Sequence, residues 1–192
     1  DRAGEAITLK SLGYDYSFLS RNEKAVECLE QALAIFRELK DPWGAGDSLT
    51  SLGIVYRLLS RYEKAIESLE QALEISHELG DRQREGNALF SLGQANFWMS
   101  HHEQAIEFLE QALAIYREGN DRAREGIVLG TLGISYQKLN RYEKAIEYHQ
   151  QALAIARESK DRLKEAVYFA NLGLTDSAMG RYEEAIELAE QA

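Results

Sequence analysis

The sequence predicts an all-α solenoid of five antiparallel helix pairs, about ten helices in all, and three observations support this prediction. The chain of 192 residues repeats every 40 residues without insertion or deletion. Two stretches of each repeat carry apolar residues at helical spacing. One proline and no long loop interrupt the pattern. A period of this length is typical of stacked arrays, in which each unit contacts mainly its neighbours.

Three residue types keep the register of the repeats. An aspartate opens each repeat, a glycine lies in the first apolar stretch, and an alanine lies in the second. These positions are Asp1, Asp41, Asp81, Asp121 and Asp161, then Gly13, Gly53, Gly93, Gly133 and Gly173, then Ala25, Ala65, Ala105, Ala145 and Ala185. We interpret residues 1–192 as a single array with repeats at 1–40, 41–80, 81–120, 121–160 and a truncated 161–192. We expect it to be an excerpt of a longer protein, because it begins without Met and stops partway through a helix.

The first half of the second repeat predicts a helix with defined ends. Asp41 is a suitable N-cap, and Pro42 suits the first helical turn, where its missing N–H has no partner anyway. Apolar residues follow at Leu49, Leu52, Tyr56 and Leu59. The dipeptide 60–61 then breaks the pattern, and the matching Asn140 and Gly180 tolerate the left-handed conformation that ends helices.

The second half of the repeat predicts a second helix, antiparallel to the first because the break is short. It begins near Tyr62 and closes at Gly80. Its apolar stripe consists of Ala65, Ile66, Leu69, Ala72, Leu73 and Ile75. Each helix should run for roughly 16–18 residues, about 25 Å. Gly53, with the small alanines of the second helix, leaves room for close helix approach, where larger side chains would overpack.

The composition makes several classes of ligand poor matches. The net charge is −10 and the pI is about 5.0, which disfavours the phosphate backbone of nucleic acid and anionic membrane surfaces. No apolar run approaches the ~18–20 residues of a membrane span. Cys28 is the only cysteine, so no internal disulfide forms, which fits a reducing cytosol. We expect a cytoplasmic protein with no nucleic-acid or membrane partner.

The pattern Leu-x2-Leu-Gly-x2-Tyr, followed by Ala-x3-Leu and Ala, resembles the tetratricopeptide repeat. It is carried here by Leu49, Leu52, Gly53, Tyr56, Ala65, Leu69 and Ala72. The usual period is 34 and ends in a proline, so the 40-residue form is similar to the long variants of kinesin light chains, spindle-orientation adaptors and bacterial signalling proteins. The resemblance implies a right-handed superhelix whose concave wall is formed by the first helix of each pair.

The resemblance also places candidate ligand residues on that wall, one helical turn apart. The candidates are Tyr14, Phe18, Ile54, Arg57, Leu58, Phe90, Gln94, Phe97, Trp98, Ile134 and Lys138. These positions vary between repeats, whereas the packing positions do not. Central aromatic residues are typical of binding hot spots, and the two cations would meet acidic groups of a partner. The alternative is that these side chains pack on the neighbouring first helices.

Two ligand-recognition modes of the family depend on particular residues, which can be compared with this sequence. The clamp for chaperone C-terminal tails needs a set of Lys, Asn and Arg, of which only Lys10 matches, so this mode is disfavoured. Long-repeat adaptors hold a peptide backbone with an Asn before the Leu-Gly pair. Only Asn171 matches, although Ser11, Ser51, Ser91 and Thr131 at this position carry hydroxyls that could donate instead. Extended-peptide binding is therefore allowed.

No catalytic, cofactor or metal site is predicted. Carboxylates share a helical face in every repeat, which fits a solvated surface better than a catalytic pair. His101 and His102 are adjacent on a turn and point in different directions, a poor arrangement for a metal. His149 replaces the leucine of the second helix and has two interpretations. It could titrate near neutral pH and loosen the packing between the third and fourth repeats, or it is a satisfied structural histidine.

We therefore interpret the chain as a non-enzymatic protein–protein interaction scaffold that binds a peptide or helix of a partner in the concave groove. The alternative is a sensor or autoinhibitory arm of a larger bacterial signalling protein, either a nucleotide-binding switch ATPase or a caspase-like protease. The phrase at 180–187 is similar to bacterial arrays attached to such domains. The apolar stripe of the last helix has no covering helix, so weak end-to-end self-association is also expected at high concentration.

Overall fold

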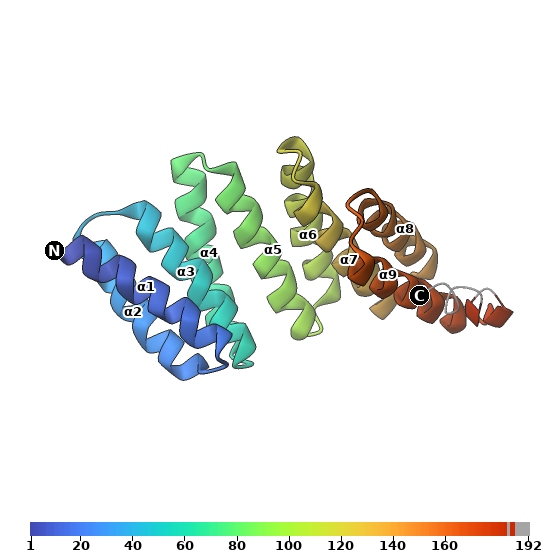
Figure 1. Ribbon diagram of the computed structural model, residues 1–192, viewed down its shortest axis with the longest axis horizontal. Coiled ribbons are helices and arrows are strands. Elements are labelled where there is room, and N and C mark those ends of the chain that lie inside the picture. Colours follow the sequence, from blue (N-terminus) through green and yellow to red (C-terminus); the bar gives the residue numbers. More distant parts are fainter. Residues whose placement is uncertain (184, 187–192) are drawn as a thin grey trace. The chain divides into compact units, whose positions relative to one another are not determined.

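The computed structural model describes residues 1–183 and 185–186, which form nine α-helices and no β-strand (Figure 1). The helices are α1 (Arg2–Phe18), α2 (Asn22–Glu38), α3 (Pro42–Leu58), α4 (Tyr62–Leu79), α5 (Arg82–Trp98), α6 (His102–Glu118), α7 (Arg122–Lys138), α8 (Tyr142–Glu158) and α9 (Arg162–Ala178). The all-α prediction is confirmed, with helices of 17 or 18 residues. The tenth expected helix lies mostly outside the described residues, and so does the surface expected to self-associate.

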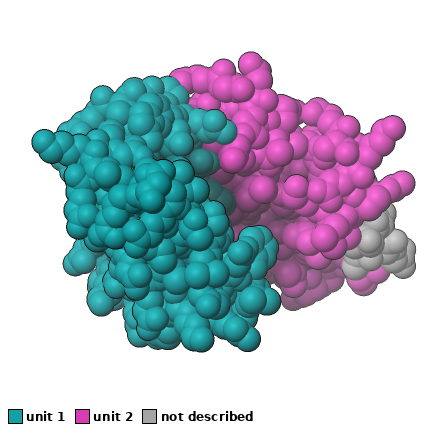
Figure 2. Space-filling view, turned by 60° about the vertical axis from the view of Figure 1, so that its left-hand side comes forward, with its two compact units in different colours: residues 1–100 teal, residues 101–192 magenta. Residues whose placement is uncertain are grey.

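The chain divides into two compact units, residues 1–100 and 101–192 (Figure 2, teal and magenta). Unit 1 contains α1–α5 and unit 2 contains α6–α9. Within each unit every helix packs on the next one along the chain. First helices of neighbouring repeats also touch, α1 with α3 and α3 with α5 in unit 1, and α7 with α9 in unit 2. The single array over the whole chain remains a prediction.

The aspartates that open the repeats cap the first helices, as predicted. The Oδ1 atom of Asp41 accepts a hydrogen bond of 3.1 Å from the backbone N–H of Gly44, and Asp81 does the same for Arg84 at 3.0 Å. Asp121 and Asp161 repeat this contact in unit 2. Each cap satisfies a backbone donor that the helix leaves unpaired, a contribution of about 1 kcal/mol.

The helix hairpins close on a left-handed residue at every break. The left-handed residue is Gly80 (φ 64°), Gly180 (φ 78°), Asn120 (φ 54°) or Asn140 (φ 56°) at four of these breaks. Residues other than Gly or Asn also adopt it, at Ser20, Lys40, Ser60, Ser100 and Lys160. The predicted left-handed ends are confirmed, but their extension to serine and lysine shows that the hairpin geometry fixes this conformation at some cost to the residue.

The glycines in register allow the two helices of a repeat to approach closely. A Cβ atom at Gly53 would lie 2.4 Å from Cγ of Leu69, and one at Gly13 would lie 2.7 Å from Cγ of Leu29. Any side chain there would therefore push the second helix away. This confirms the packing role predicted for the glycine register.

His149 fits neither of the two interpretations made from the sequence, a group that titrates near neutral pH or a hydrogen-bonded structural histidine. It is fully buried, and both ring nitrogens lack a hydrogen-bond partner, so it is not a satisfied histidine. Burial lowers its pKa to about 4, so it is neutral at pH 7 and does not titrate near neutrality. A Cβ atom at Gly133 would lie 2.4 Å from its Cε1 atom, which places His149 between α7 and α8 of the same repeat. This contact joins the two helices of the fourth repeat.

Candidate ligand-binding face

Nine of the eleven candidate residues lie on the first helices of unit 1. Three of them, Phe18, Leu58 and Trp98, occupy the same position in consecutive repeats, at the carboxyl ends of α1, α3 and α5. We call these three side chains the apolar ladder. Their exposed fractions are 90%, 48% and 56%. Large apolar side chains repeated at one exposed position do not stabilise the fold through burial, so they are candidates for contact with a partner.

A cavity of about 480 Å³ opens beside the first two members of the ladder. Tyr14 and Phe18 of α1 line it from one side, and Ile54 and Leu58 of α3 from the other. Its remaining lining is polar, from Ser17, Ser20 and Asn22. All four apolar residues were predicted from the sequence, and the structure brings them together. The volume lies within the range of about 300–1,000 Å³ typical of ligand pockets.

The aromatic residues of α5 divide between packing and exposure. Phe97 and Trp98 form an edge-to-face pair with ring centroids 5.8 Å apart. Trp98 is exposed, whereas Phe97, Phe90 and Gln94 are half-buried. The alternative interpretation, in which these side chains pack on the fold, therefore holds in part for the half-buried residues. The exposed indole remains available to a ligand, supported from the side by the Phe97 ring.

Arg57 of α3 is half-buried next to the ladder, at the position preceding Leu58. Its Nε atom is buried and has no hydrogen-bond partner. Burial also lowers the pKa of Arg57, although the guanidinium remains charged at neutral pH. A buried donor without an acceptor is rare in native proteins and requires an explanation.

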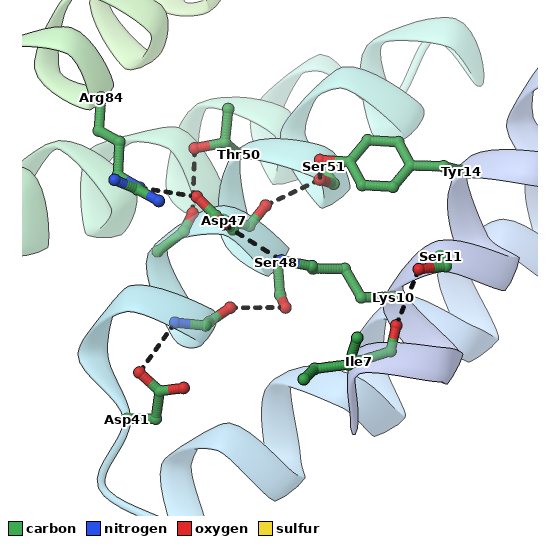
Figure 3. Close-up of polar contacts among 12 residues, drawn as sticks. Ile7, Lys10, Ser11, Tyr14, Asp41, Asp47, Ser48, Thr50, Ser51 and Arg84 are labelled. Atoms are coloured by element: carbon green, nitrogen blue, oxygen red, sulfur yellow. Dashed lines mark hydrogen bonds and ion pairs between the residues drawn. The ribbon is translucent and has the colours of Figure 1, made fainter. Parts of the chain in front are cut away.

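The cations Lys10 and Arg84, in contrast, share the carboxylate of Asp47, and Arg84 also pairs with Asp81. Lys10 of α1 binds Asp47 of α3 at 3.1 Å, and Arg84 of α5 binds the other oxygen of Asp47 at 2.8 Å (Figure 3). Burial would raise the pKa of Asp47, but the hydrogen bonds from Arg84 and Lys10 hold it below its usual range. Sequence reasoning missed this cluster. Both contacts join residues 37 positions apart, one repeat minus a helical turn, and this spacing is the signal that could have found it.

Three of the four hydroxyl groups expected to hold a peptide backbone, those of Ser11, Ser51 and Thr131, are already engaged. Ser11 and Thr131 donate to carbonyl oxygens four residues earlier on their own helices. Ser51 Oγ lies 2.7 Å from the Asp47 carbonyl oxygen and 2.7 Å from the Tyr14 hydroxyl, 37 residues away (Figure 3). Tyr14 thus bridges α1 and α3 while its ring lines the cavity. These three hydroxyls are therefore poor replacements for the missing Asn, and for Ser91 the suggestion stays a prediction.

The last two candidates lie in unit 2, on α7. Ile134 is half-buried, and Lys138 is exposed at the position that holds the apolar ladder in unit 1. That these two residues form one binding surface with the nine candidates of unit 1 remains a prediction. The described residues contain no group of three or more His, Cys, Asp or Glu side chains that could hold a metal ion. None of the described helices is long and apolar enough to span a bilayer.

The fold and this face define a helical-repeat protein with an apolar, variable surface on its first helices. A profile of the tetratricopeptide repeat matches residues 45–118 and 124–192, and a second profile of the same repeat matches residues 11–38. These matches cover well over half of the chain, which therefore belongs to the tetratricopeptide repeat family. No curated protein sequence matches the chain.

Several solved structures share the fold. A putative kinesin light chain of Podosopora anserina is 23% identical with a TM-score of 0.84, covering 100% of this chain and 94% of that one. A signal transduction ATPase with numerous domains from Pyrococcus horikoshii has a tetratricopeptide repeat sensor. It is 22% identical with a TM-score of 0.88, and the match covers 100% of this chain and 30% of that one. A Rap protein complexed with Competence and Sporulation Factor is 19% identical with a TM-score of 0.82, and the match covers 97% of this chain and 52% of that one. The predicted likeness to kinesin light chains and to the sensor array of a switch ATPase is confirmed at the level of the fold.

Proposed function

We propose that the chain is a non-enzymatic scaffold that binds a segment of a partner protein on the first-helix face of unit 1. The observation that carries this proposal is the apolar ladder of Phe18, Leu58 and Trp98 beside the cavity between α1 and α3. Exposed aromatic and aliphatic residues next to a preformed pocket are the usual anchors of peptide recognition. Membership of the tetratricopeptide repeat family supports the same conclusion, because its arrays generally serve as protein-binding scaffolds.

The chemistry of the face indicates what the partner segment should contain. An apolar side chain would enter the cavity lined by Tyr14, Phe18, Ile54 and Leu58. A carboxylate next to this side chain would satisfy Arg57, whose Nε donor is buried without a partner. Lys10 and Arg84 are already bound to Asp47, so they offer less to an acidic ligand. The partner segment should therefore combine an apolar anchor with one nearby acidic residue.

The test uses peptides selected for binding to the chain from a displayed random library. We predict that Phe97→Ala together with Trp98→Ala weakens binding of the selected peptides by at least about 2 kcal/mol, measured by calorimetry. Helicity should change little, because Trp98 is 56% exposed. Phe18→Ser should act in the same direction through the cavity wall.

The matched control is Leu163→Ser, which removes an apolar side chain that is 77% exposed on α9 of unit 2. Its affinity should equal that of the unmodified chain. If the selected peptides bound the Phe97/Trp98 double variant with the same affinity as the unmodified chain, the first helices of unit 1 would not be the binding surface. Peptides that lose affinity with the Leu163 control as well would indicate non-specific apolar adhesion.

The alternative is that the array acts as a sensor or autoinhibitory arm of a larger signalling protein. Its support is the likeness to the sensor-bearing ATPase of Pyrococcus horikoshii, of which this chain covers 30%. The same face would then bind a domain of its own polypeptide. Sequencing the reading frame that encodes the chain distinguishes the two hypotheses, since an adjoining ATPase or protease-like domain favours the sensor and a free-standing array favours the scaffold.

A further inference from the structure

A second cavity, of about 450 Å³, lies within unit 2 and involves none of the candidate groove residues. It is bounded by the beginning of α7, the end of α8 and the beginning of α9. Its apolar lining includes Gly126, Ala152, Ile155 and Ala156, with Tyr168 beside them. Charged side chains surround these residues, namely Arg122, Glu158, Asp161 and Lys164.

The repeats themselves show what normally occupies this place. The position of Ala156 is held by Phe36 in the first repeat and by Tyr116 in the third. Both rings are almost completely buried, with exposed fractions of 2% and 3%. The second repeat has the small Ser76, whose hydroxyl donates to the carbonyl oxygen of Leu73. Two of four complete repeats thus place a single aromatic ring where the fourth repeat has only a methyl group.

The surroundings of those two rings describe the contacts that a ring would make in the cavity. The Phe36 ring fills the space next to Gly44, where an added Cβ atom would lie 2.2 Å from Cδ1 of the ring. The Tyr116 ring has the Arg124 guanidinium 5.9 Å from its centroid. The residue equivalent to Gly44 and Arg124 in the fifth repeat is Lys164, which lines the cavity. A cation at the position equivalent to Arg124 therefore lines the cavity, where it could contact a bound ring.

The charges around the cavity are balanced, which bears on the ligand's own charge. Arg122 is paired with Glu158 at 2.6 Å and also with Glu125, and Lys164 is paired with Asp161 at 3.0 Å. A charged ligand would have to compete with these pairs, whereas a neutral ring would not. Tyr168 donates its hydroxyl to the Gly126 carbonyl oxygen at 2.9 Å, so its ring is fixed between α9 and α7, and the cavity is the space left beside it.

We propose that the cavity at Ala156 is a binding site for a neutral single aromatic ring, which takes the place that Phe36 and Tyr116 fill in other repeats. The ring packs on Ala152, Ile155 and Ala156, with Lys164 at its edge or face. It belongs either to a free phenolic or benzenoid molecule or to an aromatic side chain of a polypeptide. This site is independent of the proposed groove, and either can fail without the other.

The test is an NMR titration of the full chain, labelled at alanine and isoleucine methyl groups, with two probes. p-Cresol presents the ring of tyrosine as a free molecule, and N-acetyl-tyrosine amide presents it on a peptide backbone. We expect saturable shifts of the methyl signals of Ala152, Ile155 and Ala156 with at least one probe, and the tighter probe identifies the source of the ring. No saturable shift with either probe would overturn the proposal.

Specificity is tested by 4-methylcyclohexanol and by two variants of α8. The saturated ring should bind several-fold more weakly than p-cresol, and equal binding would refute an aromatic site. Ala156→Phe fills the cavity and should weaken p-cresol binding roughly tenfold or more. Ala154→Phe places the same ring on the exposed face of the same helix and should leave affinity within about twofold. If Ala156→Phe loses helicity by circular dichroism, Ala156→Leu replaces it with the same expected direction.

Discussion

The two units are built from one repeat but depart from it in different places. In unit 1 the apolar ladder and Arg57 vary from repeat to repeat at the surface, and the core changes to Ser76 and Asn96 at two positions that hold aromatic rings in the first repeat. In unit 2 the ladder position holds Lys138 and Ala178, and the departures lie in the core. His149 stands where unit 1 has Leu29 and Leu69, and Ala156 stands where the first repeat has Phe36 and the second has Ser76.

This difference separates two kinds of irregularity in a repeat protein. Surface positions do not determine how helices stack, so their variation costs little stability and is free to follow a ligand. Core positions do determine stacking, so a departure there lowers stability unless something compensates for it. This agrees with our proposal that the surface departures of unit 1 serve partner binding, and we expect the core departures of unit 2 to be measurable as lost stability or as a binding site.

The largest expected effect comes from exchanging the two core residues between units. Leu69→His should destabilise unit 1 by about 3 kcal/mol, because it replaces a fully buried apolar side chain with an unsatisfied ring against Gly53. His149→Leu should stabilise unit 2 by about 1–3 kcal/mol for the opposite reason. Hydrogen exchange of α4 and α8, read by mass spectrometry, localises each change to its unit. His77→Leu, at a histidine exposed on α4, is the control and should change little. Equal protection of α8 with and without His149 would contradict this comparison.

A second prediction concerns acid sensitivity confined to unit 2. The pKa of His149 is about 4 in the folded chain, against an ordinary value of 6.5, so the unfolded chain binds the proton more readily. The free energy of unfolding is therefore unaffected by His149 protonation above about pH 6.5. It decreases progressively as the pH falls towards 4, by about 3 kcal/mol in all. Urea unfolding at several pH values should show a steeper decline for the unmodified chain than for His149→Leu. If the free energies of unfolding of the two proteins decreased in parallel over this range, His149 protonation would not destabilise the folded chain.

Local features of this fold could be predicted from the sequence, because short-range chemistry determines them. The N-cap aspartates, Pro42 and the left-handed Gly80 define helix ends through contacts within a few residues. The face shared by Tyr14, Phe18, Ile54 and Leu58 follows from helical periodicity and the repeat length.

Features that depend on how neighbouring helices are staggered could not be predicted. The contacts of Asp47 with Lys10 and Arg84 become visible only when the offset of 37 residues is known. The cavity at Ala156 depends on the volume left by several side chains from three helices, which no single position encodes. The unpartnered nitrogens of His149 likewise need the packed structure, since a surface histidine has the same sequence signature.

The smallest expected effect tests whether the two units share the same hairpin geometry. Lys40 (φ 53°) joins α2 to α3 in unit 1, and Lys160 (φ 56°) joins α8 to α9 in unit 2. Both lysines occupy a backbone conformation that suits glycine, so Lys40→Gly and Lys160→Gly should each raise stability by about 0.5 kcal/mol, with the greater flexibility of the unfolded glycine offsetting part of the gain. Gly80→Ala, at the same place in the second repeat, should lower stability by about 1 kcal/mol. Urea midpoints for the three variants provide the measurement. Similar gains in both units would show that the units differ in their side chains and not in their hairpins, whereas a loss at either lysine would mean that its side chain makes a stabilising contact that outweighs the backbone strain.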